Sequence, residues 1–265
     1  MDKIQMFEIG LHSYCNRNCG WCPNSKFERS TYKELDEGIF KKLISDLLLA
    51  DYNRYIGIGR YSEPMFNNNL LRDRCEYIKK HLNVTIVVNT NGDYLTRRNI
   101  EDLRVDHLAI MDYDCIGLDK CINKLKSSDI EIQKISYPFV YGRTKTIESV
   151  LYYIDWPKNK LLRSKIDKRF KRIQKCLDPV RYLGVEVNGD VIACCDMRND
   201  NPDCKDYIFG NLYKESILDI IKKSKYLEFV SIMKDGLVLK YPDICKYCEK
   251  GPSRYTGDDP GYIYK

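Results

Sequence analysis

The stretch MFEIGLHSYCNRNCGWC (residues 6–22) places an apolar run directly before three closely spaced cysteines. The run predicts a short buried strand, and Cys15, Cys19 and Cys22 follow in the loop after it, with the spacing CxxxCxxC. Three thiolates on one loop suit a [4Fe–4S] cluster with three protein ligands and one open iron. The alternatives are unrelated surface cysteines and a zinc site, which would lack a nearby fourth protein ligand other than His12.

Strands and helices alternate through the first half of the chain. The periodicity predicts a first helix with Asp36 as its N-cap, and separate helices at residues 69–81, 96–103 and 117–127. Predicted strands cover residues 6–12, 55–59, 84–89, 107–112 and 131–137. Repeated βα units predict an α/β fold with a parallel sheet, either open or curled into a full or partial barrel. Ligands of such folds bind at the carboxyl ends of the strands.

The pattern changes after about residue 150, which predicts two domains, 1–150 and 151–265. Two apolar or alternating runs joined by Asn188-Gly189 predict a β-hairpin. An amphipathic helix is expected over residues 216–233, followed by a cysteine-containing loop.

Composition restricts the class of protein. The chain has 265 residues, 43% of them hydrophobic, which is enough to form a core, and a net charge of +6. The positive excess lies in residues 158–175, which we interpret as a solvated helix or linker, with contact to an anionic substrate or to RNA as alternatives. No run approaches the ~18 apolar residues of a membrane helix, and no signal peptide precedes the first strand. We therefore expect a cytoplasmic protein that binds neither membranes nor nucleic acid.

Twelve cysteines in a cytoplasmic chain favour metal binding over disulfides. The chain has three histidines, so its metal sites are expected to use mostly sulfur. A second set of cysteines follows the first half: Cys176, Cys194, Cys245 and Cys248, with Cys195 and Cys204 close by as alternative ligands. Four thiolates can bind either zinc or a second [4Fe–4S] cluster.

These motifs together resemble the radical S-adenosylmethionine (SAM) superfamily. In that family a CxxxCxxC loop after the first strand of a partial (β/α)6 barrel holds the cluster, and SAM binds its open iron. An aromatic residue before the third cysteine is usual, and Trp21 matches it. Tyr61-Ser62-Glu63-Pro64 resembles the GGEP motif that receives the SAM ammonium group, with Tyr61 and Ser62 in place of the two glycines. Thr90-Asn91-Gly92 resembles the segment that lines the SAM ribose and carboxylate.

The second cysteine set resembles the C-terminal SPASM and twitch domains, in which a β-hairpin and a helix hold auxiliary iron–sulfur clusters. No cysteine follows Cys248, so the resemblance implies one auxiliary [4Fe–4S] cluster of the twitch type. Phe209-Gly210-Asn211-Leu212 matches the twitch pattern as well. The spacing from Gly189 assigns Cys194 as the ligand, with Cys195 and Cys204 left as alternatives.

The resemblance implies a radical SAM oxidoreductase that needs SAM, two [4Fe–4S] clusters and a flavodoxin or ferredoxin-type electron donor. Among twitch proteins the chain is most similar to aminocyclitol dehydrogenases, which oxidise a secondary alcohol of a sugar-like ring to a ketone. The catalytic base is unassigned, with Tyr137, Arg143 and Lys145 as nearby candidates. The alternatives are an epimerase of a sugar or aminoglycoside, a maturase of ribosomal peptides, and a non-catalytic iron–sulfur or zinc protein.

Overall fold

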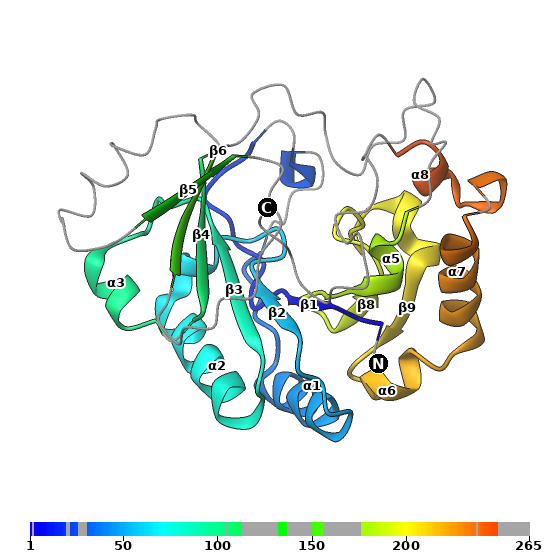
Figure 1. Cartoon of the computed structure of the whole chain (residues 1–265), viewed down its shortest axis with the longest axis horizontal. Helices are drawn as coiled ribbons and strands as arrows, with labels where there is room; N and C mark the ends of the chain where they lie inside the picture. Colours follow the sequence, from blue (N-terminus) through cyan, green and yellow to red (C-terminus); the bar gives the residue numbers. More distant parts are fainter. Residues whose placement is uncertain are drawn as a thin grey trace.

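A nine-stranded mixed sheet forms the centre of the molecule, in the order β5-β6-β4-β3-β2-β1-β7-β8-β9 (Figure 1). The structure is a computed structural model, and it describes residues 1, 3–19, 22–25, 31–103, 105–112, 132–136, 150–155, 176–236 and 238–248.

The first six strands run parallel, as the alternating pattern predicted. They are β1 (Met6–Ile9), β2 (Tyr55–Ile58), β3 (Thr85–Thr90), β4 (His107–Asp112), β5 (Ile132–Ser136) and β6 (Val150–Asp155). Strand β6 was not predicted, although its sequence VLYYID contains the apolar run of a buried strand. It lies between β4 and β5, so the expected domain boundary at 150/151 falls at the start of a strand of the N-terminal sheet.

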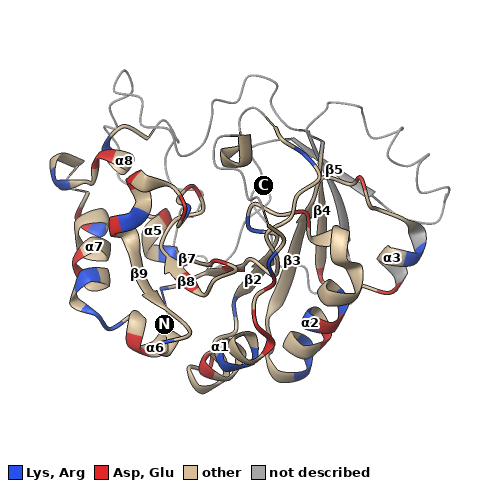
Figure 2. Ribbon diagram, turned by 180° about the vertical axis from the view of Figure 1, so that it is seen from behind, with Lys and Arg blue, Asp and Glu red and all other residues tan. Residues whose placement is uncertain are grey.

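Three helices cover the outer face of the curved parallel sheet (Figure 1). They are α1 (Glu37–Leu49), α2 (Asn68–His81) and α3 (Arg97–Glu101). Each begins after a residue whose side-chain oxygen accepts a hydrogen bond from a backbone N–H of the first turn; these N-caps are Asp36, Asn67 and Thr96. The predicted helix at 117–127 lies outside the described residues. Figure 2 shows acidic and basic residues mixed along α1, α2 and α7, which is typical of solvated helix faces.

The predicted β-hairpin is confirmed in the C-terminal half. Strands β7 (Tyr182–Val185) and β8 (Asp190–Ile192) pair antiparallel, and β9 (Ile208–Asn211) extends the sheet beyond β8. Gly189 occupies the turn with φ +80°, a left-handed conformation that glycine adopts without steric cost. Short helices α5 (Asp178–Arg181) and α8 (Asp243–Lys246) flank this hairpin in the sequence.

The single helix expected over residues 216–233 is wrong, because the segment forms two helices. They are α6 (Ile217–Ile220) and α7 (Ser224–Asp235), and Lys223 between them is extended, with φ −62° and ψ 142°. The break lets the two apolar faces pack in different directions. The α6 side chains pack near α1 and β9, whereas Phe229 of α7 lies against Phe209 of β9, with 5.2 Å between the ring centroids.

The two halves share one sheet, because β1 pairs with β2 on one side and with β7 on the other. Both pairings are parallel and in register with the same four residues, Met6–Ile9. A continuous hydrophobic core therefore extends from the parallel strands into the C-terminal half. None of the helices in the described part of the chain is long and apolar enough to cross a membrane.

Candidate cluster and cofactor sites

The loop after β1 carries the first three cysteines, all partly buried. The Cys22 N–H donates to the Cys19 carbonyl oxygen at 2.8 Å, so the end of the loop is a tight turn. The pKa of Cys15 is raised to about 11, mainly by burial and to a smaller extent by nearby Glu63, Cys22 and Cys19. The other two thiols thus lie within electrostatic range of Cys15. A bound metal centre would supply the positive charge that stabilises their thiolate forms.

The cysteine loop is fastened to the turn that follows β3. Arg17 donates two hydrogen bonds to the Asp93 carboxylate, both at 2.6 Å, in a bidentate ion pair. Asn16 donates to the same carboxylate at 2.7 Å and accepts a hydrogen bond from the Asn91 side chain at 2.9 Å. Residues between Cys15 and Cys19 are thus held against the end of β3, which is separated from β1 by β2 in the sheet.

Glu63 connects the segments that follow β2 and β3. Its carboxylate accepts hydrogen bonds from the Thr90 hydroxyl at 2.5 Å, the Asn91 N–H at 2.7 Å and the Met65 N–H at 3.1 Å. The side chain is buried, which raises the pKa of Glu63 to about 7 despite these donors. The Gly92 N–H in turn donates to the Thr90 hydroxyl oxygen at 3.0 Å.

The structure therefore brings together most of the residues that sequence predicted for SAM. Glu63, Thr90, Asn91 and Gly92 form one hydrogen-bonded unit at the carboxyl ends of β2 and β3. The Glu63 N–H also donates to the Tyr14 carbonyl oxygen at 2.9 Å, which joins this unit to the residue before Cys15. Ser62 lies in the same turn, where its N–H donates to the Gly59 carbonyl oxygen at 3.1 Å. Trp21 lies outside the described residues.

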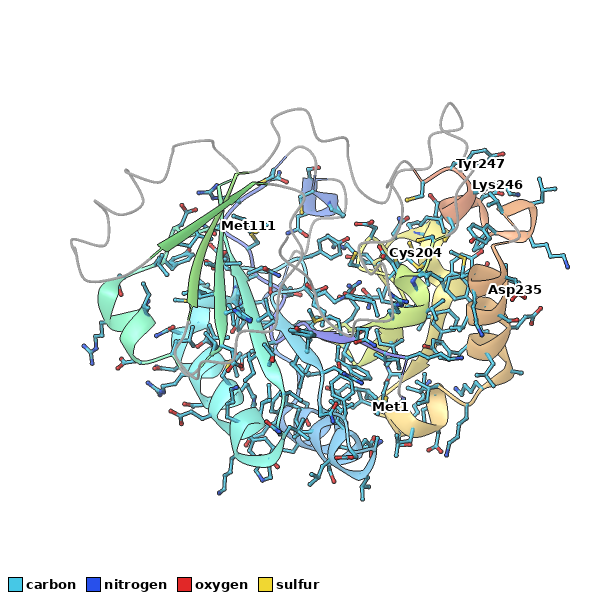
Figure 3. All side chains as sticks on the ribbon, viewed as in Figure 1. Met1, Met111, Cys204, Asp235, Lys246 and Tyr247 are labelled. Atoms are coloured by element: carbon cyan, nitrogen blue, oxygen red, sulfur yellow. The ribbon has the colours of Figure 1, made fainter. Side chains whose placement is uncertain are left out.

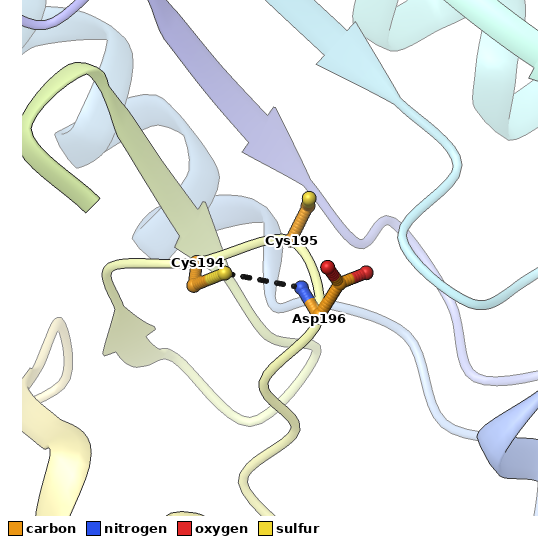
Figure 4. A group of neighbouring side chains, drawn as sticks. All are labelled: Cys194, Cys195 and Asp196. Carbon is orange, nitrogen blue, oxygen red and sulfur yellow. Dashed lines mark hydrogen bonds between the residues drawn. The ribbon is translucent and has the colours of Figure 1, made fainter. Parts of the chain in front are cut away.

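The second cysteine set lies entirely in the C-terminal half. Cys176, Cys194 and Cys245 are buried in the continuous core, and Cys248 is partly buried one turn after Cys245. The Cys194 sulfur accepts a hydrogen bond from the Asp196 N–H at 3.4 Å (Figure 4). Hydrogen bonds to cluster sulfurs help to set reduction potentials.

Cys195 and Cys204, the alternative ligands, lie in different surroundings. The Cys194 and Cys195 sulfurs point in different directions (Figure 4). Burial raises the pKa of Tyr182 on β7 well above its usual value, and Cys195 is one of the neighbours that add to this, so Cys195 lies close to β7. Cys204, labelled in Figure 3, is fully buried in the C-terminal half. Burial also raises the pKa of Tyr207, with Cys245 and Cys204 among the contributing neighbours, so Cys204 lies near the predicted ligands.

The donor chemistry of both sites fits iron–sulfur clusters. Within the described ranges, one group of three potential ligands has its atoms within 4.8 Å of one another, namely Cys194, Cys195 and Asp196. In a cubane each thiolate binds a different iron, so its ligand sulfurs stand farther apart than ligands that share one ion. His12, the candidate fourth ligand for zinc, is buried and its Nδ1 already accepts the Tyr14 N–H at 3.2 Å. Both sites therefore offer thiols rather than imidazoles.

A buried charged network near the sulfurs was missed by the sequence analysis. Arg60, after β2, donates to Glu186 at 2.9 Å and to the Tyr182 hydroxyl at 2.6 Å, and its guanidinium lies 3.5 Å from Glu8 on β1. Gly184 makes room for it, because a Cβ there would lie 2.8 Å from the Arg60 guanidinium carbon. The signal for this network in the sequence was the pair of strand glycines, Gly57 and Gly184. In the sheet they lie on either side of Glu8 and pair with it.

Comparisons with known proteins agree with this geometry. Residues 176–249 match the SPASM family, an iron–sulfur cluster-binding domain, and this range contains all four predicted auxiliary ligands. The chain is 28% identical over 257 residues to the S-adenosyl-L-methionine-dependent 2-deoxy-scyllo-inosamine dehydrogenase of Niallia circulans, covering 94% of each chain. The chain is thus similar, over nearly its whole length, to an enzyme that depends on S-adenosyl-L-methionine.

Solved structures show a similar fold. BtrN in complex with AdoMet and 2-DOIA superimposes with a TM-score of 0.70 at 23% identity, covering 97% of each chain. BtrN in an open conformation gives 0.63 at 25% identity over 94% of each chain. The AdoMet-bound anSMEcpe structure gives 0.53 at 12% identity, covering 91% of this chain and 84% of that one. The predicted partial barrel with a small C-terminal cluster domain is confirmed at the level of the fold.

Proposed function

We propose that this chain is a radical SAM enzyme that oxidises a secondary alcohol of a small aminocyclitol-like ring to a ketone. The observation that carries the proposal is the joining of the CxxxCxxC loop to the ends of β2 and β3 through Arg17–Asp93 and Glu63, with a second set of cysteines in the C-terminal half. The dehydrogenase from Niallia circulans, which is similar over nearly the whole chain, supports the choice of substrate class.

The proposed ligands divide into three groups. Cys15, Cys19 and Cys22 would hold the cluster that binds SAM. The SAM molecule would lie along Trp21, Tyr61, Ser62, Glu63, Thr90, Asn91 and Gly92. Cys176, Cys194, Cys245 and Cys248 would hold the auxiliary cluster, with the Asp196 N–H as a hydrogen-bond donor to Cys194.

When bound, the two clusters and SAM would supply two things: a 5′-deoxyadenosyl radical that removes a hydrogen atom, and an acceptor for one electron. The alcohol loses one hydrogen atom, one proton and one electron in total, which is the two-electron oxidation to a ketone. The protein has to hold the reactants in place and exclude water. The candidate bases Tyr137, Arg143 and Lys145 lie outside the described residues.

We further propose a flavodoxin or ferredoxin-type protein as the source of the electron that starts each turnover. A cytoplasmic location is part of this proposal, since two sets of cysteines proposed to bind clusters suit a reducing compartment. We assign the SAM site to the N-terminal strands, including β6, and the auxiliary cluster to residues 176–248.

Iron analysis of anaerobically reconstituted protein tests the cofactor content. Two clusters give about eight iron atoms per chain, and a variant with Cys15, Cys19 and Cys22 all changed to Ala should retain about four. About four iron atoms plus one zinc in the wild type would show that the C-terminal cysteines bind zinc and not a cluster.

Product analysis tests the reaction. Wild-type enzyme incubated with SAM, dithionite and 2-deoxy-scyllo-inosamine should release 5′-deoxyadenosine and the ketone, and the triple Ala variant should release neither. If fully loaded enzyme released 5′-deoxyadenosine but oxidised no aminocyclitol, the substrate class would be wrong. If it released none at all, the radical SAM reaction would be excluded.

A further inference from the structure

Tyr61 has a backbone conformation that favours glycine. Its φ is +50°, and among the described non-glycine residues only Asp51 shares a positive φ. Left-handed φ is unfavourable for a residue with a Cβ and persists where surrounding contacts hold it. Tyr61 also stands where the radical SAM motif has a glycine, so its side chain must make contacts that a glycine could not.

The Tyr61 side chain reaches the C-terminal half of the molecule. Its hydroxyl donates to the Cys195 carbonyl oxygen at 2.5 Å, across 134 positions of sequence. Its ring contacts two buried guanidinium groups, with Arg60 Cζ and Arg198 Cζ each 5.4 Å from the ring centroid. Such cation–π contacts are strong when the cation is desolvated.

Both arginines are themselves held in place. Arg60 donates to Glu186 at 2.9 Å and to the Met197 carbonyl oxygen. Arg198 donates to the Asp200 carboxylate at 2.7 Å, with a second contact to the other carboxylate oxygen. The ring therefore contacts two cations that are themselves held at the loop formed by residues 194–200.

A third contact joins Tyr61 to the first cysteine loop. Asn24, two residues after Cys22, donates from its side-chain amide to the Tyr61 carbonyl oxygen at 3.0 Å. The oxygen of the same amide accepts a hydrogen bond from Arg198. Tyr61 thus lies in a closed set of contacts with the segment after Cys22 and the segment after Cys194.

We propose that Tyr61 is a positioning residue that fixes the loop at residues 194–198 against the segment after Cys22, and so sets the relation between the two cluster sites. The inference rests on the proposed function, in which one electron leaves the substrate for the auxiliary site. The Tyr61 contact is one peptide unit from Cys194, and Asp196, whose N–H reaches the Cys194 sulfur, follows directly. Movement of this loop would alter both the hydrogen bonding and the solvent exposure of that ligand.

Two variants separate the contacts of Tyr61. Tyr61→Phe removes the hydroxyl and keeps the ring, and Tyr61→Gly removes the ring and restores the residue of the motif. The matched control is Tyr213→Phe, which removes a hydroxyl from a tyrosine that is 53% exposed. Circular dichroism shows whether each full-length variant folds, and Tyr61→Phe keeps the test valid if Tyr61→Gly does not.

The first measurement is amide hydrogen exchange in the full-length chain without cofactors. Loss of one hydrogen bond should speed exchange at residues 194–198 by about three- to tenfold in Tyr61→Phe, and more in Tyr61→Gly. Tyr213→Phe should exchange there like the wild type. Equal exchange in Tyr61→Phe and the wild type would overturn the proposal.

The second measurement is the midpoint potential of the auxiliary cluster, in a background where Cys15, Cys19 and Cys22 are Ala. The potential should shift in both Tyr61 variants and not in Tyr213→Phe, because hydrogen bonding and exposure of the sulfurs set it. A change confined to SAM affinity, with exchange and potential unaltered, would assign Tyr61 to the SAM site alone and overturn the proposal.

The third measurement is coupling in the complete enzyme. Tyr61→Phe should release more 5′-deoxyadenosine per ketone formed than the wild type does, since electron acceptance is impaired after radical formation. Exchange and potential need no substrate, so they test the positioning role even if the dehydrogenase reaction fails. The converse outcome is also distinct. If the wild type forms the ketone, but Tyr61→Phe leaves exchange, potential and coupling unchanged, the positioning role is overturned and the dehydrogenase reaction is not.

Discussion

Glu63 shows how much a single buried carboxylate organises at this site. Its oxygens are acceptors for Thr90, Asn91 and Met65, all within 3.1 Å. The sequence motif predicted a residue near the SAM ammonium group, and the structure adds a second role, because the same side chain ties the ends of β2 and β3 together. A glutamate in this environment is needed for its two acceptor oxygens as well as for its charge.

Removing the Glu63 carboxylate should therefore destabilise the chain. In Glu63→Ala the buried Asn91 and Met65 N–H groups lose their acceptor, and we expect the free energy of unfolding in urea to fall by about 1–3 kcal/mol at pH 8. Glu63→Gln keeps one acceptor oxygen and should lose less. The control Glu37→Ala, at an exposed residue of α1, should lie within about 0.5 kcal/mol of the wild type. Equal stability of all the variants would show that these hydrogen bonds contribute little.

His107 makes a pH-dependent contribution to stability. It is fully buried on β4, and this burial lowers the pKa of His107 to about 4 from its usual 6.5. Between these values the unfolded chain binds a proton that the folded chain does not, so stability should fall as the pH drops from about 6.5 to about 4. The slope from this group approaches ~1.4 kcal/mol per pH unit. Urea unfolding of His107→Gln should show a shallower slope over this range, and parallel curves would contradict the assignment.

At the scale of elements, helix α1 joins the two halves through side chains one turn apart. Lys42 donates to the carbonyl oxygens of Leu212 and Glu215 at 2.9 and 2.8 Å. Asp46 accepts the N–H of Ile217, the first residue of α6, at 3.0 Å. Sequence predicted α1 and its N-cap correctly, but these polar residues on a mostly apolar face gave no indication of their distant partners.

The Asp46 contact should be important for docking α6. Asp46→Ala leaves a buried N–H at the start of α6 without this acceptor, and we expect a loss of about 1–2 kcal/mol in the free energy of unfolding. Asp46→Asn keeps an acceptor oxygen of similar shape and should lose about half as much or less. Chemical denaturation followed by circular dichroism measures both, and an Ala variant as stable as the Asn variant would rule out the capping role.

At the scale of the whole molecule, the shared sheet makes the two halves interdependent. Strand β1 lies between β2 and β7, and the buried Arg60 network crosses the same boundary. Separating the halves would expose both an unpaired strand edge and buried charges, each of which is costly.

We therefore expect the full-length chain without cofactors to unfold in one cooperative transition. Hydrogen exchange across a urea series should give the same midpoint for peptides from residues 31–103 and 176–236. Circular dichroism should give that midpoint as well. Two separated midpoints would show that the halves fold independently.

Local signals in the sequence were enough for most elements and for the cysteine motifs. The N-cap at Asp36, the Asn188-Gly189 turn and the CxxxCxxC spacing each depend on residues a few positions apart, so their physical consequences are local. For the same reason the split between α6 and α7 escaped prediction, since it serves packing against distant elements and no glycine or proline marks it.

By itself, the sequence determined the alternation of strands and helices, the hairpin and two sets of thiols suited to iron–sulfur clusters. Only the tertiary structure decided that β6 lies between β4 and β5, that β1 pairs with β7, and that Tyr61 reaches Cys195. These pairings join residues tens to more than a hundred positions apart. At such separations in sequence, many donors could pair with any one acceptor. The actual pair is decided when folding brings particular buried groups within hydrogen-bonding distance.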